Sequence, residues 1–291
     1  MTPLAQQALA EGASQISLVL CTTATPAGIV ACVAITCYVL ARRRPPADCA
    51  RLQRFLIIPL AAVILGLIAS TNHLGRPSNT LYVLMGVGRS PLSNEVVAVV
   101  VFTGLAWLGW LLSFARGRGL RAARVLLALS LPAAVFALAR IAGAYSIATV
   151  ITWSLPYTPA NLVLAALTGG PVLALCVFSA AKVDPGRAAA AALATGIIAG
   201  IALTASECLQ YAALQSLQSG LYRAADLVPF YPGCIAGPAA LIACGLAVLA
   251  VPLARRVPLS TARCAGCAAL VLAGLAVARF AFYCLRLTAG F

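Results

Sequence analysis

Charged residues are scarce in this chain of 291 residues. They make up 9% of the sequence, whereas a soluble globular domain contains about 25%, and 63% of the residues are hydrophobic. This balance excludes a soluble globular protein and indicates an integral membrane protein. The apolar runs are roughly 20 residues long, which favours membrane-spanning helices over the shorter, alternating strands of a barrel.

Histidine occurs once, and several cofactor motifs are missing. A single histidine cannot supply both axial ligands of a bis-histidine haem, so a di-haem cytochrome anchor is excluded. There is no Gly-x-x-x-x-Gly-Lys loop, which excludes ATP-driven activity of the P-loop type. The Cys264-Ala-Gly-Cys267 pair lacks a second cysteine pair or a nearby histidine and is a weak metal signal. We therefore expect no haem and no metal in this protein.

We predict an all-α, polytopic membrane protein that forms one integral membrane domain over residues 1–291. No repeat of 20–50 residues is visible. The hydrophobic runs predict a bundle of eight transmembrane helices, with spans at about 16–40, 55–71, 96–114, 120–145, 160–181, 188–208, 234–253 and 264–285.

The basic residues orient these spans. Nineteen of the 20 are arginines, and they form short clusters between apolar spans, a pattern that fits a lipid bilayer rather than nucleic acid as the partner. The loops after spans one, three, five and seven carry 14 basic residues, whereas the other three loops carry three. The positive-inside rule then predicts that both termini lie outside the cytoplasm.

The outer loops are unusual. Residues 72–95 form a long connection whose middle, residues 81–88, is apolar enough to lie in the interface or dip into the protein. Residues 153–159 and 228–232 combine prolines with aromatic residues. Such loops form either an ordinary aromatic belt with turn prolines or the roof of a pocket.

Five ionisable residues converge on the outer leaflet. His73 follows span two, Glu95 opens span three, Arg140 lies near the end of span four, Glu207 closes span six and Arg279 lies in the outer half of span eight. Ionisable groups inside a membrane are costly and are functional candidates by default. A histidine and a carboxylate placed together can accept two protons, the number released when a quinol is oxidised.

Each candidate also has a structural interpretation. His73 could bond a loop carbonyl at the interface, and Glu95 could be a first-turn helix carboxylate capped by Ser93 or Asn94. Arg140 and Arg279 could compensate the carboxylates, hydrogen-bond a quinone carbonyl, or extend to the lipid headgroups.

The run His73-Leu74-Gly75-Arg76-Pro77, followed by Leu92-Ser93-Asn94-Glu95, resembles the membrane-anchor subunit of bacterial dimethyl sulfoxide reductases. The resemblance implies a menaquinol-oxidising subunit of a three-part complex in the bacterial cytoplasmic (inner) membrane. Its partners would be an iron–sulfur electron-transfer subunit and a molybdopterin catalytic subunit. The family's quinol-site histidine and glutamate correspond to His73 and Glu95. Arg140, Glu207 and Arg279 are further candidates for quinol binding, chosen only from their expected depth in the membrane.

Two alternatives remain open from the sequence. A secondary transporter could use the outer cluster for proton coupling, although transporter sites usually lie near the midplane between inverted repeats. A bare anchor that binds no quinone would make His73 and Glu95 dispensable.

Overall fold

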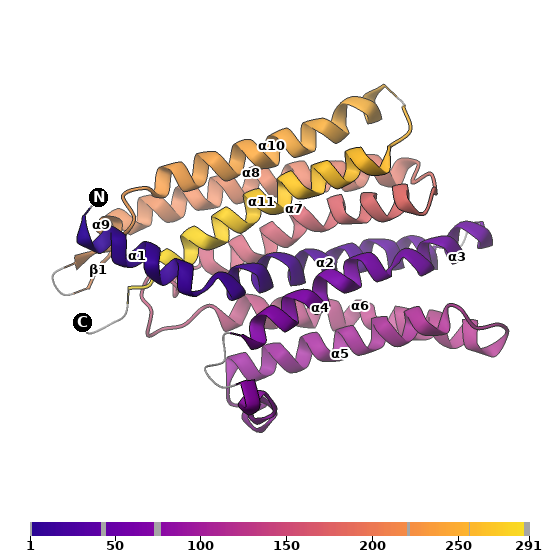
Figure 1. The fold of residues 1–291 in the computed structure, drawn as a ribbon, viewed down its shortest axis with the longest axis horizontal. Helices are drawn as coiled ribbons and strands as arrows, with labels where there is room; N and C mark the ends of the chain where they lie inside the picture. The colour runs from indigo at the N-terminus through magenta and orange to yellow at the C-terminus, as the bar shows by residue number, and fades with distance from the viewer. Residues whose placement is uncertain (1, 42–44, 73–76, 220–221, 256, 288–291) are drawn as a thin grey trace.

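The computed structural model describes residues 2–41, 45–72, 77–219, 222–255 and 257–287. Within these residues, eight helices are long and apolar enough to cross a membrane, and they run side by side along the long axis of the molecule (Figure 1). Strand structure in the described part is limited to the antiparallel pair β1 (Gln218–Ser219) and β2 (Tyr222–Arg223). The predicted all-α bundle of eight spans is confirmed.

The second span is a pair of helices broken at one residue, and three short helices lie outside the spans. The spans are α2 (Ile16–Leu40), α3 with α4 (Pro46–Phe55 and Ile57–Thr71), α5 (Pro91–Leu112), α6 (Arg118–Ala144), α7 (Tyr157–Ala180), α8 (Arg187–Ser216), α10 (Tyr231–Ala254) and α11 (Thr261–Cys284). The short helices are α1 (Pro3–Ser14), the 3-10 helix η1 (Pro77–Gly86) and α9 (Ala224–Leu227).

Helix α8 is longer than its hydropathy predicts. The apolar run predicts that the sixth span ends at about residue 208, but α8 continues to Ser216. Its last two turns bury Gln210 and Leu214 against neighbouring elements, and this packing continues the helix beyond its apolar run. Glu207 therefore lies more than two turns inside the helix and not at its end.

Helix α1 precedes the predicted first span. The Thr2 hydroxyl accepts a hydrogen bond from the Ala5 N–H at 3.3 Å and caps the helix, and Pro3 fits its first turn. Gly12 lies so close to α11 that an added Cβ would come within 2.5 Å of Cys284 Sγ. Together with an ion pair between Glu11 and Arg286, this contact fixes the N-terminal helix to the C-terminal end of the protein.

The eight spans form two sets of four with the same contact pattern. In the first set, α2 and α5 each pack on both α4 and α6; in the second, α7 and α10 each pack on both α8 and α11. Figure 1 shows the first set in indigo to magenta and the second in rose to yellow. Helix α2 joins the sets because it also packs on α7 and α11.

Both termini lie at one end of the bundle, together with α9 and the β1–β2 pair (Figure 1). We call this the terminal end and the opposite one the arginine end. The described basic residues in and beside the connections at the arginine end are Arg51, Arg54, Arg116, Arg118, Arg121, Arg124, Lys182, Arg187, Arg255 and Arg263. The charge asymmetry in the sequence is thus an asymmetry between the two ends of the fold.

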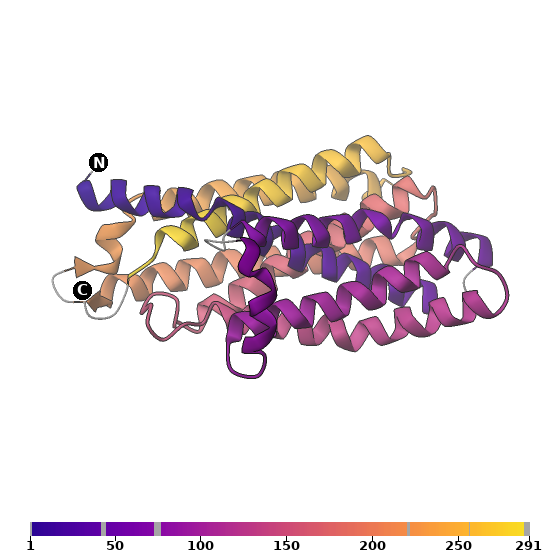
Figure 2. The ribbon, with the colours of Figure 1, turned by 60° about the horizontal axis from the view of Figure 1, so that its bottom comes forward.

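The apolar middle of the long connection before α5 lies on the surface. Helix η1 crosses the long axis of the bundle (Figure 2), and Leu81, Tyr82, Leu84 and Met85 are exposed on it. Of the two predicted positions, the structure favours the interface over insertion into the protein, because these side chains face away from the core.

Close packing of α2 on α4 depends on Gly28. An added Cβ there would lie 2.7 Å from the Pro59 carbonyl oxygen and 2.8 Å from a Val63 methyl. We expect Gly28→Ala to lower the free energy of unfolding by about 1–3 kcal/mol, because backbone has to move. Gly104→Ala is the control, since its Cβ meets nothing within 4 Å. Denaturant unfolding of both variants in detergent tests this; equal stability would contradict it.

Candidate functional site

Three of the five predicted site residues are buried at the terminal end. Glu95, Glu207 and Arg279 have relative exposures of 6%, 8% and 3%, and the charge of Arg279 acts on both carboxylates. Arg140 is exposed on α6, with its guanidinium 4.8 Å from the centroid of the Phe136 ring, and is not part of this group. His73 lies outside the described residues.

Arg279 is held by groups that leave part of it unpaired. Its Nε donates to the Thr22 hydroxyl at 3.3 Å, and its guanidinium carbon lies 4.3 Å from the centroid of the Phe282 ring, a cation–π contact. Nη2 is buried without a hydrogen-bond partner among the described residues. Among the described residues, neither Glu95 nor Glu207 forms an ion pair with Arg279. Arg279 is therefore a fixed buried cation that still has a donor to offer.

Glu95 lies in the second turn of α5. The helix is capped by Ser90, whose hydroxyl accepts from the Ser93 N–H at 3.5 Å, and Pro91 occupies the first turn. The predicted cap at Ser93 or Asn94 is wrong, because Pro91 fits the start of a helix; the Asn94 side chain instead accepts from the Gly88 N–H at 2.7 Å. One carboxylate oxygen of Glu95 is buried and has no partner within the described structure.

Aromatic rings of Tyr145, Phe282 and Tyr283 pack around the Arg279 guanidinium. Trp153 stacks on Phe282 with ring centroids 4.9 Å apart, and its Nε1 donates to the Phe282 carbonyl at 3.2 Å. Tyr145 and Tyr283 lie edge to face, with centroids 6.2 Å apart.

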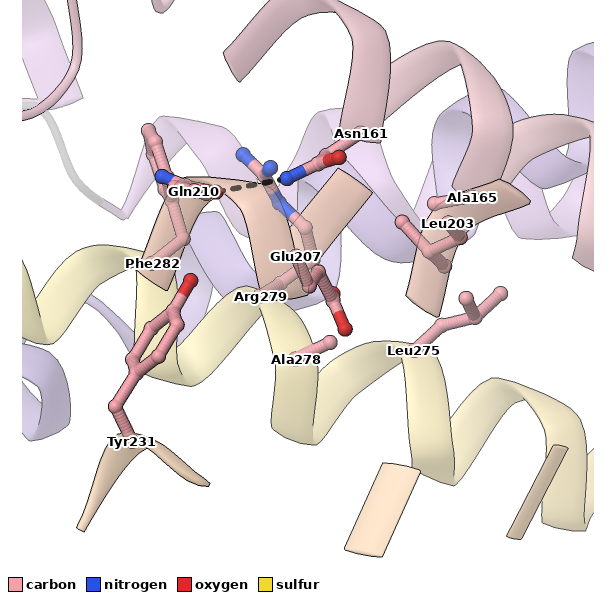
Figure 3. A pocket seen from close by; sticks show the side chains of 10 residues that line it. All are labelled: Asn161, Ala165, Leu203, Glu207, Gln210, Tyr231, Leu275, Ala278, Arg279 and Phe282. Carbon is pink, nitrogen blue, oxygen red and sulfur yellow. Dashed lines mark hydrogen bonds between the residues drawn. The ribbon is translucent and has the colours of Figure 1, made fainter. Parts of the chain in front are cut away.

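A narrow cleft opens on the other side of Arg279, between α7, α8, α10 and α11. Figure 3 shows Asn161 and Gln210 joined by a hydrogen bond, with the Arg279 guanidinium beside them; Asn161 Nδ2 donates to Gln210 Oε1 at 2.8 Å. Tyr231 lines the cleft from the first residue of α10, and Glu207 directs its carboxylate along Ala278. Ala165, Leu203, Leu275 and Phe282 complete the lining with apolar groups.

The polar atoms of this cleft are not saturated. Asn161 Oδ1 and Gln210 Nε2 are buried and find no partner in the described residues, as is true of Arg279 Nη2. Buried polar groups without protein partners usually contact water or a ligand. The free space between the side chains holds about one water molecule. The cleft can therefore bind water, but is too narrow for a bicyclic quinol ring.

Sequence reasoning missed several residues of the site. Asn161 and Gln210 are polar residues near the ends of apolar runs, and the span predicted to end near 208 placed Gln210 in a loop. Tyr145 is at the C-cap of α6 and carries no motif. Of the loops that combine proline with aromatics, one supplies Trp153 and the other leads into Tyr231. Asn161 could have been identified from the sequence, because it is an amide side chain within an apolar span.

Known proteins resemble this one over nearly its whole length. The family model described as DMSO reductase anchor subunit (DmsC) matches residues 9–285, a range that contains every site residue above. The sequence is 31% identical over 247 residues to the YnfH protein of the anaerobic dimethyl sulfoxide reductase of Escherichia coli (strain K12), covering 84% of this protein and 85% of the relative. It is 31% identical over 228 residues to the C subunit of the anaerobic dimethyl sulfoxide reductase of that strain, covering 78% and 79%. The C subunit of the Haemophilus influenzae enzyme is 25% identical over 221 residues, covering 76% and 78%.

Glu207 should be energetically coupled to Arg279. Replacing Arg279 by leucine leaves Glu95 and Glu207 buried without their cation, which is destabilising. Glu207→Gln should then cost less in the Arg279→Leu background than in the wild type, with a coupling of about 0.5 kcal/mol or more in a double-mutant cycle. Unfolding of the four proteins in detergent measures this. Additive effects would show that Arg279 and Glu207 act independently.

Proposed function

This protein belongs to the family of dimethyl sulfoxide reductase anchor subunits, and we propose that within such a complex it oxidises menaquinol beside Glu95 and Arg279. It is a multi-pass protein of the bacterial inner membrane that anchors a reductase complex. The finer proposal concerns what the anchor does there: it takes electrons and protons from a membrane-soluble donor and passes the electrons on.

The observation that carries the proposal is a buried acceptor and a buried donor, both unpartnered within the described residues. Glu95 supplies a carboxylate oxygen and Arg279 supplies Nη2, and Phe282, Tyr283 and Tyr145 supply aromatic rings around the guanidinium. A quinol presents two hydroxyl groups on an apolar ring system. The available groups therefore fit a quinol. The carboxylate can accept a hydrogen bond from a quinol hydroxyl, the guanidinium can donate one to a quinol oxygen, and the aromatic rings can pack on the quinol ring.

The residues also fit the proton chemistry. Bound menaquinol supplies two electrons and two protons per oxidation. Glu95 is placed to accept one proton, and we propose His73 as the acceptor of the other, since the segment that contains it follows α4, which packs on α5. Arg279 remains charged throughout; its role is to orient an oxygen of the substrate and to balance the carboxylate.

We further propose that the terminal end faces away from the cytoplasm, as the arginines at the other end indicate. The exposed apolar side chains of η1 would then lie in the outer interface beside the site. Electrons leave to an iron–sulfur subunit, which delivers them to a molybdopterin catalytic subunit. Because the site is at the terminal end, we propose that the iron–sulfur subunit docks there.

Inhibitor binding to the assembled complex tests the proposal. A quinol-analogue inhibitor is titrated on membranes that contain all subunits, with the wild-type anchor, His73→Ala and Glu95→Gln. We expect saturable binding to the wild type and a loss of affinity of about tenfold or more in each variant, because a hydrogen bond to a charged group is worth about 1.5–3 kcal/mol. Quinol-dependent reduction should fall in parallel, with assembly unchanged.

Asp226→Asn is the matched control, since it removes an exposed carboxylate at the same end of the bundle. It should bind the inhibitor as the wild type does. Equal binding in all variants would move the site away from His73 and Glu95. Absence of binding in the wild-type complex would support a bare anchor.

A further inference from the structure

We propose that Glu207 is the proton-exit residue of this protein: it receives, through water in the cleft, a proton that Glu95 has accepted and releases it at the terminal end. This inference rests on the proposed menaquinol oxidation and deepens it. It assigns a separate role to Glu207, which the sequence analysis grouped with the quinol-binding residues only because of its expected depth in the membrane.

Glu207 and Glu95 belong to different sets of spans. Glu95 comes from α5 in the first set of spans, and Glu207 comes from α8 in the second. Arg279 interacts electrostatically with both, and Glu207 lines the water-sized cleft. Glu95 does not line this cleft, and the cleft is too narrow for a quinol ring, so a quinol that contacts Glu95 does not reach Glu207 through it, whereas a water molecule can occupy the space beside Glu207.

The charges favour exchange of a proton between the two carboxylates. One buried cation, Arg279, serves two buried carboxylates, so the local charge is balanced when one of them is ionised and the other is protonated. When Glu95 accepts a proton, Arg279 loses its compensating anion and then favours the ionised form of Glu207. The other titratable groups acting at Glu207 are Tyr231 and Cys234 of α10, which are neutral when protonated.

The lining of the cleft gives the exit a direction. Polar groups lie toward the terminal end: Tyr231 begins α10 and Asn161 is in the first two turns of α7. Leu203 and Leu275 lie about one turn deeper, because each precedes a polar lining residue of its own helix, Glu207 or Arg279, by four positions. Water and protons are thus accommodated on the outer side and excluded by leucine on the inner side.

Protons balance without a further reactant. A substrate hydroxyl gives its proton to the Glu95 carboxylate while the electrons leave toward the partner subunit. The Glu95 proton passes by way of water beside Arg279, which lines the cleft, to the Glu207 carboxylate, and Glu207 gives a proton to the outer water. Asn161 and Gln210 position that water through their unpartnered Oδ1 and Nε2 atoms, and Arg279 keeps all its protons.

Turnover and inhibitor binding of the whole complex separate this role from quinol binding. For Glu207→Gln we expect quinol-dependent turnover to fall about tenfold or more while the affinity for the quinol-analogue inhibitor stays within about twofold of the wild type. Glu207→Asp should recover part of the turnover. Thr204→Val is the control: it lies one turn away on α8, bonds only the Gly200 carbonyl in the described structure, and does not line the cleft.

Chemical rescue provides a readout that a structural role would not produce. Glu207→Ala removes a carboxylate from the cleft and leaves space of that size. Added formate should enter this space and restore turnover several-fold in a saturable manner, with no effect on the wild type or on Thr204→Val. A dye that reduces the partner subunits directly serves as the check that those subunits are unaffected.

The outcomes are distinguishable. Full turnover in Glu207→Gln overturns the proton-exit role and leaves menaquinol oxidation standing. Loss of inhibitor affinity together with turnover, without formate rescue, makes Glu207 a binding or structural residue and also overturns it. If the wild-type complex neither binds the inhibitor nor oxidises menaquinol, the proposed function itself fails.

Discussion

A buried arginine determines how this end of the bundle is built. Arg279 lies where α11, in the second set of spans, meets α2 of the first, and it bonds across that boundary to Thr22. A cation inside a membrane protein is costly unless it is compensated, and here aromatic rings, a hydroxyl and two carboxylates at longer range share that task. The placement of Glu95, Glu207 and the rings follows from this requirement.

The two sets of spans put their carboxylates at corresponding corners. Glu95 lies near the connection between the second and third spans of the first set, and Glu207 with Tyr231 lies near the same connection of the second set. The corners differ in composition: polar side chains line a narrow cleft in the second, whereas Glu95 of the first does not line that cleft. The rings of Tyr145, from α6, and of Tyr283, from α11, lie against Arg279. One repeated arrangement can therefore provide a site for an apolar ring and a site for water.

Most of the fold was predictable because hydropathy, helix length and arginine placement are local properties of the sequence. The eight spans, their order and the shared end of the termini follow from them. The end of α8 was not predictable, because Gln210 continues the helix through a bond to Asn161, 49 positions earlier. Glu95 and Arg279 were recognisable as charges in apolar runs, but their common environment depends on how α5 packs on α6, α6 on α2 and α2 on α11, which no local pattern encodes. Arg140 carried the same signal and lies on the outer surface.

Close helix packing is also found away from the polar site. The close contacts of Gly28 with α4 and of Gly170 with Val30 lie in the middle of the spans, where small residues let helices approach. A core joined in this way tolerates unsatisfied polar atoms at one end, where Glu95, Asn161, Gln210 and Arg279 would otherwise be a liability. Replacing all of these groups together by apolar side chains should remove function more readily than fold, because a buried set of opposite charges often contributes little net stability. Their cost is therefore better explained by the proposed movement of protons than by the folding of the bundle.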